Sequence, residues 1–127
     1  MLTSAGINSY SISWWAKASS PSSWAAFFGQ NNSPRFQFRN SDKFLYVNGV
    51  CNPDVSITST STVTYGIWEH WTVVLGADKS VKIYKNGIID TSSSCGTLST
   101  FGVGSATIGR PATSVTTNNY SGQIADA

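Results

Sequence analysis

The residues with the greatest chemical potential lie in WEHWTVVL, residues 68–75, where the only histidine of the chain follows its only glutamate. An imidazole beside a carboxylate is a possible general base, metal ligand or member of a hydrolytic triad. A serine triad needs an oriented nucleophile, and the G-x-S-x-G motif that presents one on a sharp turn does not occur in the sequence. We therefore interpret His70 as a half-buried strand residue that is hydrogen-bonded to a neighbour.

Glycoside hydrolysis requires two carboxyl groups about 5–10 Å apart on one surface. The chain has one glutamate, Glu69, and five aspartates, and no two acids stand two positions apart. Asp42, Asp78 and Asp90 lie in or near turns, where aspartate is favoured for its side-chain bonds to the backbone. The sequence therefore predicts that the protein is not an enzyme, with glycan cleavage as the lowest-ranked alternative.

Two cysteines, Cys51 and Cys95, stand 44 residues apart. A disulfide closing a loop of that length would stabilise the fold by ~3–4 kcal/mol. Two buried free thiols fit the sequence equally well, and the redox compartment decides between them. Neither cysteine stands in a C-x-x-C motif or beside residues that would activate a thiolate.

The composition favours an exported protein. Charged residues make up only 11%, whereas serine and threonine number 34 and asparagine nine. The net charge is +2, and its densest group, Arg35, Arg39 and Lys43, is too sparse to predict nucleic-acid binding. No apolar run approaches the roughly 20 residues that cross a bilayer, so membrane insertion is not expected. An extracellular, cell-surface or virion location is expected.

Alternation of apolar and polar residues, with a period of two, recurs along the chain and predicts an all-β protein. Asn48-Gly49 and Asn86-Gly87 are predicted hairpin turns. Residues 51–66 are predicted to be a long loop or a polar edge strand, and residues 91–104 and 111–119 are predicted loops. Strands are predicted at 10–17, 24–30, 35–40, 43–50, 68–75, 80–85, 106–110 and 120–127, with 68–90 forming a three-stranded meander.

An ordered set of motifs resembles one known family. The motifs are YSISWWAK, WEHWTVVL, VKIYKNG, ATIGR and YSGQIAD, within residues 10–126. Together they resemble the laminin-G-like domains of the concanavalin A-like lectin and glucanase jelly rolls. The resemblance implies an antiparallel two-sheet β-sandwich and one domain over residues 1–127. Family members usually have a strand before the first motif and another after the last. The chain is therefore expected to be a fragment, or to borrow a strand from a neighbouring chain.

The resemblance also suggests where ligands would bind. Relatives often hold calcium at a sandwich rim, and the corresponding candidates here are Asp126, Asp54 and Asp78. Sugar recognition combines aromatic faces with amide groups, because a pyranose ring has an apolar side and a rim of hydroxyls. The predicted sugar-binding residues are Trp15, Tyr46, Asn118, Asn119 and Tyr120. Trp24 is expected to cap the core.

The leading prediction is a non-catalytic binding or adhesion module that recognises glycans, with calcium as the one plausible cofactor. The alternative is a structural virion or cell-surface domain that acts by packing against neighbouring protein chains, as an oligomer or in a larger assembly.

Overall fold

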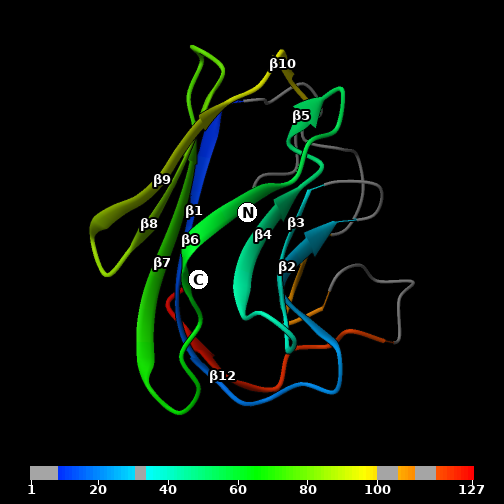
Figure 1. The fold of residues 1–127 in the computed structure, drawn as a ribbon, viewed down its shortest axis with the longest axis vertical. Coiled ribbons are helices and arrows are strands. Elements are labelled where there is room, and N and C mark those ends of the chain that lie inside the picture. Colours follow the sequence, from blue (N-terminus) through cyan, green and yellow to red (C-terminus); the bar gives the residue numbers. More distant parts are fainter. Residues whose placement is uncertain (1–8, 31–33, 100–105, 111–116) are drawn as a thin grey trace.

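A computed structural model describes residues 9–30, 34–99, 106–110 and 117–127. They form two five-stranded antiparallel sheets packed face to face, with a two-stranded sheet at one end (Figure 1). The described residues contain no helix with the length and apolarity needed to cross a bilayer. The strands are β1 (Tyr10–Ala18), β2 (Trp24–Gln30), β3 (Arg35–Arg39), β4 (Phe44–Asn48), β5 (Cys51–Asn52), β6 (Ile57–Thr62), β7 (Trp68–Leu75), β8 (Ser80–Lys85), β9 (Ile88–Ser94), β10 (Thr97–Leu98), β11 (Ala106–Ile108) and β12 (Gly122–Ala125).

The first sheet, which we call sheet A, has the strand order β12-β1-β7-β8-β9. Its centre is the pair β1 and β7, in which Trp14 faces Trp71 and Trp15 faces His70. Successive side chains of a strand point to opposite faces. Trp14 and Trp71 are therefore 2% and 0% exposed in the core, whereas Trp15 is 40% exposed on the outer face.

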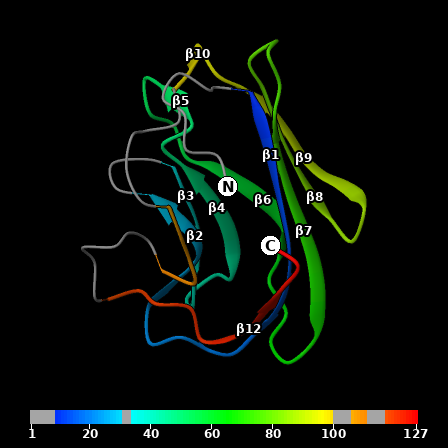
Figure 2. The ribbon, with the colours of Figure 1, turned by 180° about the vertical axis from the view of Figure 1, so that it is seen from behind.

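The second sheet, sheet B, has the order β11-β2-β3-β4-β6 and supplies the aromatic half of the core. Phe27, Phe36 and Phe38 are fully buried, and the Phe27 and Phe38 rings lie 5.1 Å apart. The Trp14 ring of sheet A lies 5.2 Å from that of Phe27, so the contact joins the two layers. Figure 2 shows the layers from behind, with β12 and the β1–β2 loop running side by side at one end.

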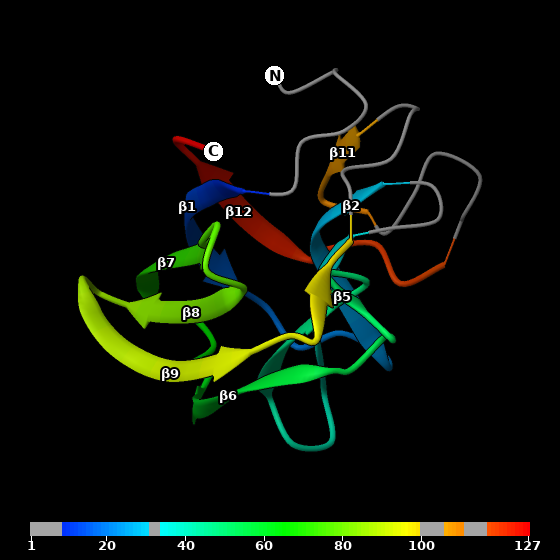
Figure 3. The ribbon, with the colours of Figure 1, turned by 90° about the horizontal axis from the view of Figure 1, so that it is seen from above.

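One carboxylate closes one side of the sandwich. Asp90 on β9, the edge strand of sheet A, accepts hydrogen bonds from the backbone amides of Thr60 (2.7 Å) and Ser61 (2.9 Å) on β6, the edge strand of sheet B. Figure 3 shows these two strands next to each other when the fold is viewed from above. These two hydrogen bonds satisfy edge amides that would otherwise be open to pairing with another chain.

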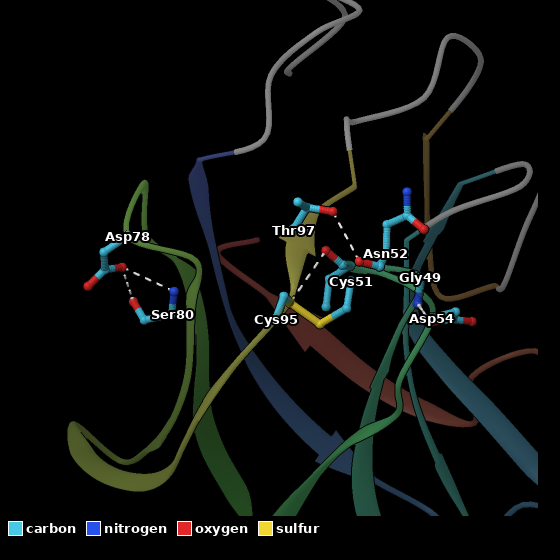
Figure 4. Close-up of a disulfide and its surroundings, with 9 residues drawn as sticks. Gly49, Cys51, Asn52, Asp54, Asp78, Ser80, Cys95 and Thr97 are labelled. Atoms are coloured by element: carbon cyan, nitrogen blue, oxygen red, sulfur yellow. Dashed lines mark hydrogen bonds between the residues drawn. A yellow bond between two sulfur atoms is a disulfide. The ribbon is translucent and has the colours of Figure 1, made fainter.

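A disulfide joins Cys51 to Cys95 (Figure 4). Of the two alternatives that the sequence left open, the disulfide is therefore confirmed and the pair of free thiols is not. The bond ties the end of β9 to the small sheet formed by β5 and β10. The Thr97 hydroxyl donates to the Asn52 carbonyl across the same pair of strands (3.0 Å).

The predicted all-β antiparallel sandwich is confirmed, and the strands at 24–30, 68–75 and 80–85 have the predicted bounds. The Asn86-Gly87 turn is a hairpin in which both residues have positive φ (52° and 79°), the requirement of a type I′ turn. Residues 51–66 contain the predicted polar edge strand as β6, preceded by the short β5.

Two predictions about the connections were wrong. Asn48-Gly49 does not make a hairpin: β4 pairs with β3 and β6, while the chain turns away to pair β5 with β10. The segment predicted as loop from residue 91 continues β9 to Ser94 and then forms β10. Its serines carry no apolar alternation, but they pair with β8, whose own pattern is strong. Residues 100–105 and 111–116 lie outside the described part of the chain.

Candidate functional site

An aromatic cluster lies on the outer face of sheet B, where three neighbouring strands bring Trp24, Arg39 and Tyr46 together. Trp24 on β2 is the register partner of Arg39 on β3, and Tyr46 on β4 faces Gln37. The Trp24 and Tyr46 rings meet edge to face at 5.2 Å. The Arg39 guanidinium carbon lies 5.4 Å from the Trp24 ring and 5.0 Å from the Tyr46 ring, within cation–π range of both. We call these residues and Asp42 the Trp24 cluster.

Asp42 holds the cluster in one arrangement. The Arg39 Nε donates to Asp42 Oδ2 at 2.7 Å, and the Tyr46 hydroxyl donates to the same oxygen at 2.5 Å. The Arg39 hydrogen bond, supported by that of Tyr46, keeps the pKa of Asp42 below its ordinary value. Burial and the neighbouring Asp42 carboxylate raise the pKa of Tyr46. The cluster is therefore a charged network at neutral pH, with its aromatic faces fixed by polar bonds.

A hollow of about 540 Å³ opens beside the cluster, and Trp24 belongs to both. One wall is the β1–β2 loop and the other is the segment that leads into β12. The side chains around it are hydroxyls, amides, a proline and one indole, with no charged group. The lining residues are Ser20, Pro21, Ser22, Ser23, Trp24, Thr117, Asn118, Asn119 and Ser121.

Backbone hydrogen bonds fix the two walls relative to each other. The Ser19 amide donates to the Ser121 carbonyl (2.8 Å), and the Ala26 amide donates to the Asn118 carbonyl (3.0 Å). Asn118 has a φ of 59°, a left-handed conformation that asparagine adopts more readily than most residues. At Gly122 a β-carbon would lie 2.2 Å from the Lys17 carbonyl oxygen, so only glycine allows the wall to approach β1 this closely.

The chemistry of this hollow suits a neutral polyhydroxyl compound. An indole offers an apolar face to the C–H side of a sugar ring, and surrounding hydroxyls and amides both donate and accept bonds to sugar hydroxyls. The volume lies within the range of small-molecule sites, which combine apolar surface with a few placed polar groups.

The structure brings together three of the five predicted sugar-binding residues. Asn118 and Asn119 line the hollow, and Tyr46 contacts Trp24 at its border. Trp15 lies on the outer face of the opposite sheet, against His70. Tyr120 packs against the core, with its ring 5.0 Å from that of Phe27, and burial raises the pKa of its hydroxyl. We therefore leave Trp15 and Tyr120 out of this site.

The predicted calcium ligands lie apart from one another. Asp54 accepts a hydrogen bond from the Gly49 amide, and Asp78 accepts bonds from the amide and hydroxyl of Ser80 in its own turn. Figure 4 shows these two aspartates on opposite sides of the disulfide. Asp126 follows β12. In the described ranges no three acidic, histidine or cysteine side chains form a group able to hold a metal, and calcium binding stays a prediction.

His70 and Glu69 belong to the framework of sheet A. The backbone of His70 exchanges two hydrogen bonds with Asn86, and its ring lies 5.1 Å from that of Trp15. Glu69 is 4% exposed; it forms an ion pair with Lys85 at 2.8 Å and accepts the Thr64 amide. The carboxylate thus binds the β6–β7 connection to the sheet, in a buried position rather than on a surface open to substrate.

Sequence reasoning missed Trp24 and Arg39 as site residues. Trp24 was expected to cap the core, and Arg39 was counted among scattered surface charges. The alternation of residues 35–40 already places Gln37 and Arg39 on one face, opposite the buried Phe36 and Phe38. What the sequence lacks is the register that sets Arg39 beside Trp24 and within reach of Tyr46.

Two solved structures share this fold. The CBM40 of Ruminococcus gnavus IT-sialidase, bound to α2,3-sialyllactose, has a TM-score of 0.71 at 11% identity, over 90% of this chain and 71% of its own. Domain 4 of AbnA, a GH43 extracellular arabinanase of Geobacillus stearothermophilus in complex with arabinotriose, also has a TM-score of 0.71, at 20% identity. That match covers 97% of this chain but only 59% of the other. No curated protein matches the chain by sequence.

A family model matches nearly the whole chain, over residues 2–127. The match agrees with the two antiparallel sheets and with the ordered motifs from YSISWWAK to YSGQIAD. The chain belongs to the concanavalin A-like lectin/glucanases superfamily.

Proposed function

We propose that this domain is a non-catalytic carbohydrate-binding module that takes the end of a neutral glycan into the hollow beside the Trp24 cluster. The observation that carries the proposal is one indole among hydroxyl and amide side chains, in a hollow with no charged lining residue. The CBM40 and AbnA domains, which have the same fold, are each bound to a sugar, and this supports a carbohydrate as the general class of ligand.

Each group has a role in this proposal. The Trp24 ring stacks on the apolar face of a sugar, while Arg39 and Tyr46 contact the indole and hold it in place. Asn118 and Asn119 provide amides on the opposite wall. Because the walls are fixed by backbone bonds before ligand arrives, little ordering entropy is lost on binding.

A location outside the cytosol fits this role. The Cys51–Cys95 disulfide persists in oxidising compartments and is rare where thiols are kept reduced. We therefore propose that the domain acts in an extracellular or cell-surface setting, where glycans are exposed.

Glycan arrays followed by calorimetry test the proposal. The unmodified chain should bind one class of neutral oligosaccharide saturably, and Trp24→Ala should weaken that affinity more than tenfold, since central aromatic residues carry most of such binding energy. Trp24→Phe should keep much of the binding. Asn118→Gly keeps the left-handed backbone but removes one amide, so we expect a smaller loss.

Ile108→Ala is the matched control, because Ile108 is a large exposed side chain of sheet B outside the hollow (54%). If Trp24→Ala keeps its fold by circular dichroism and binds the glycan with unchanged affinity, the hollow is not the binding site. No saturable binding to any glycan, together with a stable oligomer in light scattering, would favour packing against neighbouring chains instead.

A further inference from the structure

The outer face of sheet A carries a second exposed aromatic group, made of residues that do not line the hollow. Trp15 on β1 and Trp68 on β7 are 40% and 42% exposed. The residue that precedes Trp15, Trp14, and the residue that follows Trp68, Glu69, point inward and are 2% and 4% exposed. The two indoles lie on the outer face of the sheet, opposite the core, so the packing of the sandwich does not require them.

The β1–β7 register places these indoles close together. Trp15 faces His70, and Lys17 faces Trp68, so the two tryptophans occupy diagonal positions on adjacent strands. Such positions are about 7–8 Å apart, within reach of aromatic side chains. The His70 ring lies 5.1 Å from that of Trp15 and extends the same surface. On the far side of β1, Gln123 of β12 faces Lys17. We call Trp15, Lys17, Trp68 and His70 the Trp15 face.

The outward side chains of the Trp15 face itself include a cation, Lys17, and no acid. Among the strand residues of sheet A the acidic ones are Glu69 and Asp90. Glu69 is buried against Lys85, and Asp90 is bonded to β6. Asp126 directly follows Ala125, the register partner of Trp15, so it is the acid beyond the strand ends that lies nearest to this face in register. Lys17 forms no salt bridge within the part of the chain that the structure describes.

We infer that the Trp15 face is a second carbohydrate-binding surface, separate from the hollow, and that it takes sugars bearing a carboxylate. The two indoles stack on the apolar faces of successive rings, and the Lys17 ammonium pairs with the sugar carboxylate. The His70 ring supports Trp15 from the neighbouring strand. An acidic sugar is favoured over a neutral one because the cation lies beside the aromatic group, without an opposing acid on the strands of this face. The inference does not depend on binding at the hollow.

Oligosaccharides of galacturonate, glucuronate and sialic acid, each paired with its methyl ester, test the inference by array and calorimetry. The acid and its ester present the same rings and differ only in charge. The unmodified chain should bind at least one acid, at least fivefold more tightly than its ester. Trp15→Ala and Trp68→Ala should each weaken that binding more than tenfold. Lys17→Met should remove the preference for the acid while keeping affinity for the ester, and added salt should weaken binding of the acid alone.

Trp24→Ala and Trp15→Ala separate the two sites. Trp24→Ala should leave binding of the acidic sugar unchanged, and Trp15→Ala should leave binding of the neutral glycan unchanged, so either site can fail without the other. Equal affinity for acid and ester, binding of no carboxylated sugar, or full binding by Trp15→Ala would each overturn the inference. A dimer in light scattering that Trp15→Ala converts to monomer would overturn it as well, because a second copy would then cover the face.

Discussion

Replacing Glu69 by alanine is expected to lower the free energy of unfolding by about 3 kcal/mol, because the change leaves the half-buried ammonium of Lys85 without its buried partner. The Glu69 side chain is 6% exposed and that of Lys85 is 19% exposed, and their charged atoms are 2.8 Å apart. Breaking such a pair from one side costs about 3–5 kcal/mol in proteins. The Thr64 amide also loses its acceptor, at 3.2–3.3 Å.

The expected cost lies at the lower end of that range because Lys85 keeps two other favourable contacts. Its ammonium donates to the Thr62 carbonyl at 2.7 Å and lies 5.3 Å from the centre of the Trp71 ring. For a chain of 127 residues, a loss of about 3 kcal/mol corresponds to a decrease in Tm of about 10 °C. Urea unfolding followed by tryptophan fluorescence measures the free energy directly, and the slope against denaturant should stay unchanged.

Two further variants separate the lost charge from the lost volume. Glu69→Gln keeps an acceptor for Thr64 and should cost less, about 2 kcal/mol. The double variant Glu69→Leu with Lys85→Met replaces both charges by apolar groups, and should unfold within about 1 kcal/mol of the unmodified chain. Asp126→Asn is an exposed control expected to change stability by no more than about 0.5 kcal/mol. A cost below about 1 kcal/mol for Glu69→Ala would refute the assignment of Glu69 as a structural carboxylate.

Two other predictions concern the sides and ends of the sandwich. Replacing Cys51 and Cys95 by alanine should lower the free energy of unfolding by about 4 kcal/mol, as loop closure over 44 residues requires, and urea unfolding under non-reducing conditions measures it. Reduction of the unmodified chain should reproduce that loss. For Asp90, burial opposes ionisation, but hydrogen bonds from Ser61, Thr91 and the Thr60 amide outweigh it, so its pKa is lowered. A lowered pKa in the folded state stabilises the fold above the ordinary aspartate pKa of about 3.9, and this contribution disappears as the pH falls through the folded value. Asp90→Asn should therefore reduce stability at pH 7 by about 1–2 kcal/mol and flatten its fall below about pH 4; an equally steep fall in the variant would contradict this role.

Much of the strand pattern could be predicted because it depends on alternation, which a strand's own side chains specify. Trp14, Trp71 and Phe36 are buried, whereas the residues directly before and after each of them are exposed or half-buried, and this alternation identifies the buried face. The Asn86-Gly87 hairpin could also be predicted, because its turn depends only on these two residues, which both adopt the positive φ that it requires. The serine-rich end of β9 was not predictable in this way, since its pairing comes from β8 and not from its own apolar residues.

The candidate site shows the same division. Asn118, Asn119 and Tyr46 could be identified as residue types suited to sugars, but Trp24 and Arg39 could not, because their importance depends on the register between β2, β3 and β4. Tyr120 had the right chemistry beside two asparagines, yet its ring packs against Phe27. A residue's type limits what it can do, whereas the neighbouring strand determines whether it faces solvent.

The sequence by itself determined the class of fold, the two faces of each strong strand and the pool of residues able to bind a sugar. These properties follow from side-chain spacing of two and from the chemistry of single residues. Tertiary structure decided which residues of that pool meet. The hollow forms because residues 117–121 return to the β1–β2 loop about 100 positions away in the chain, held there by backbone bonds whose partners no local pattern specifies.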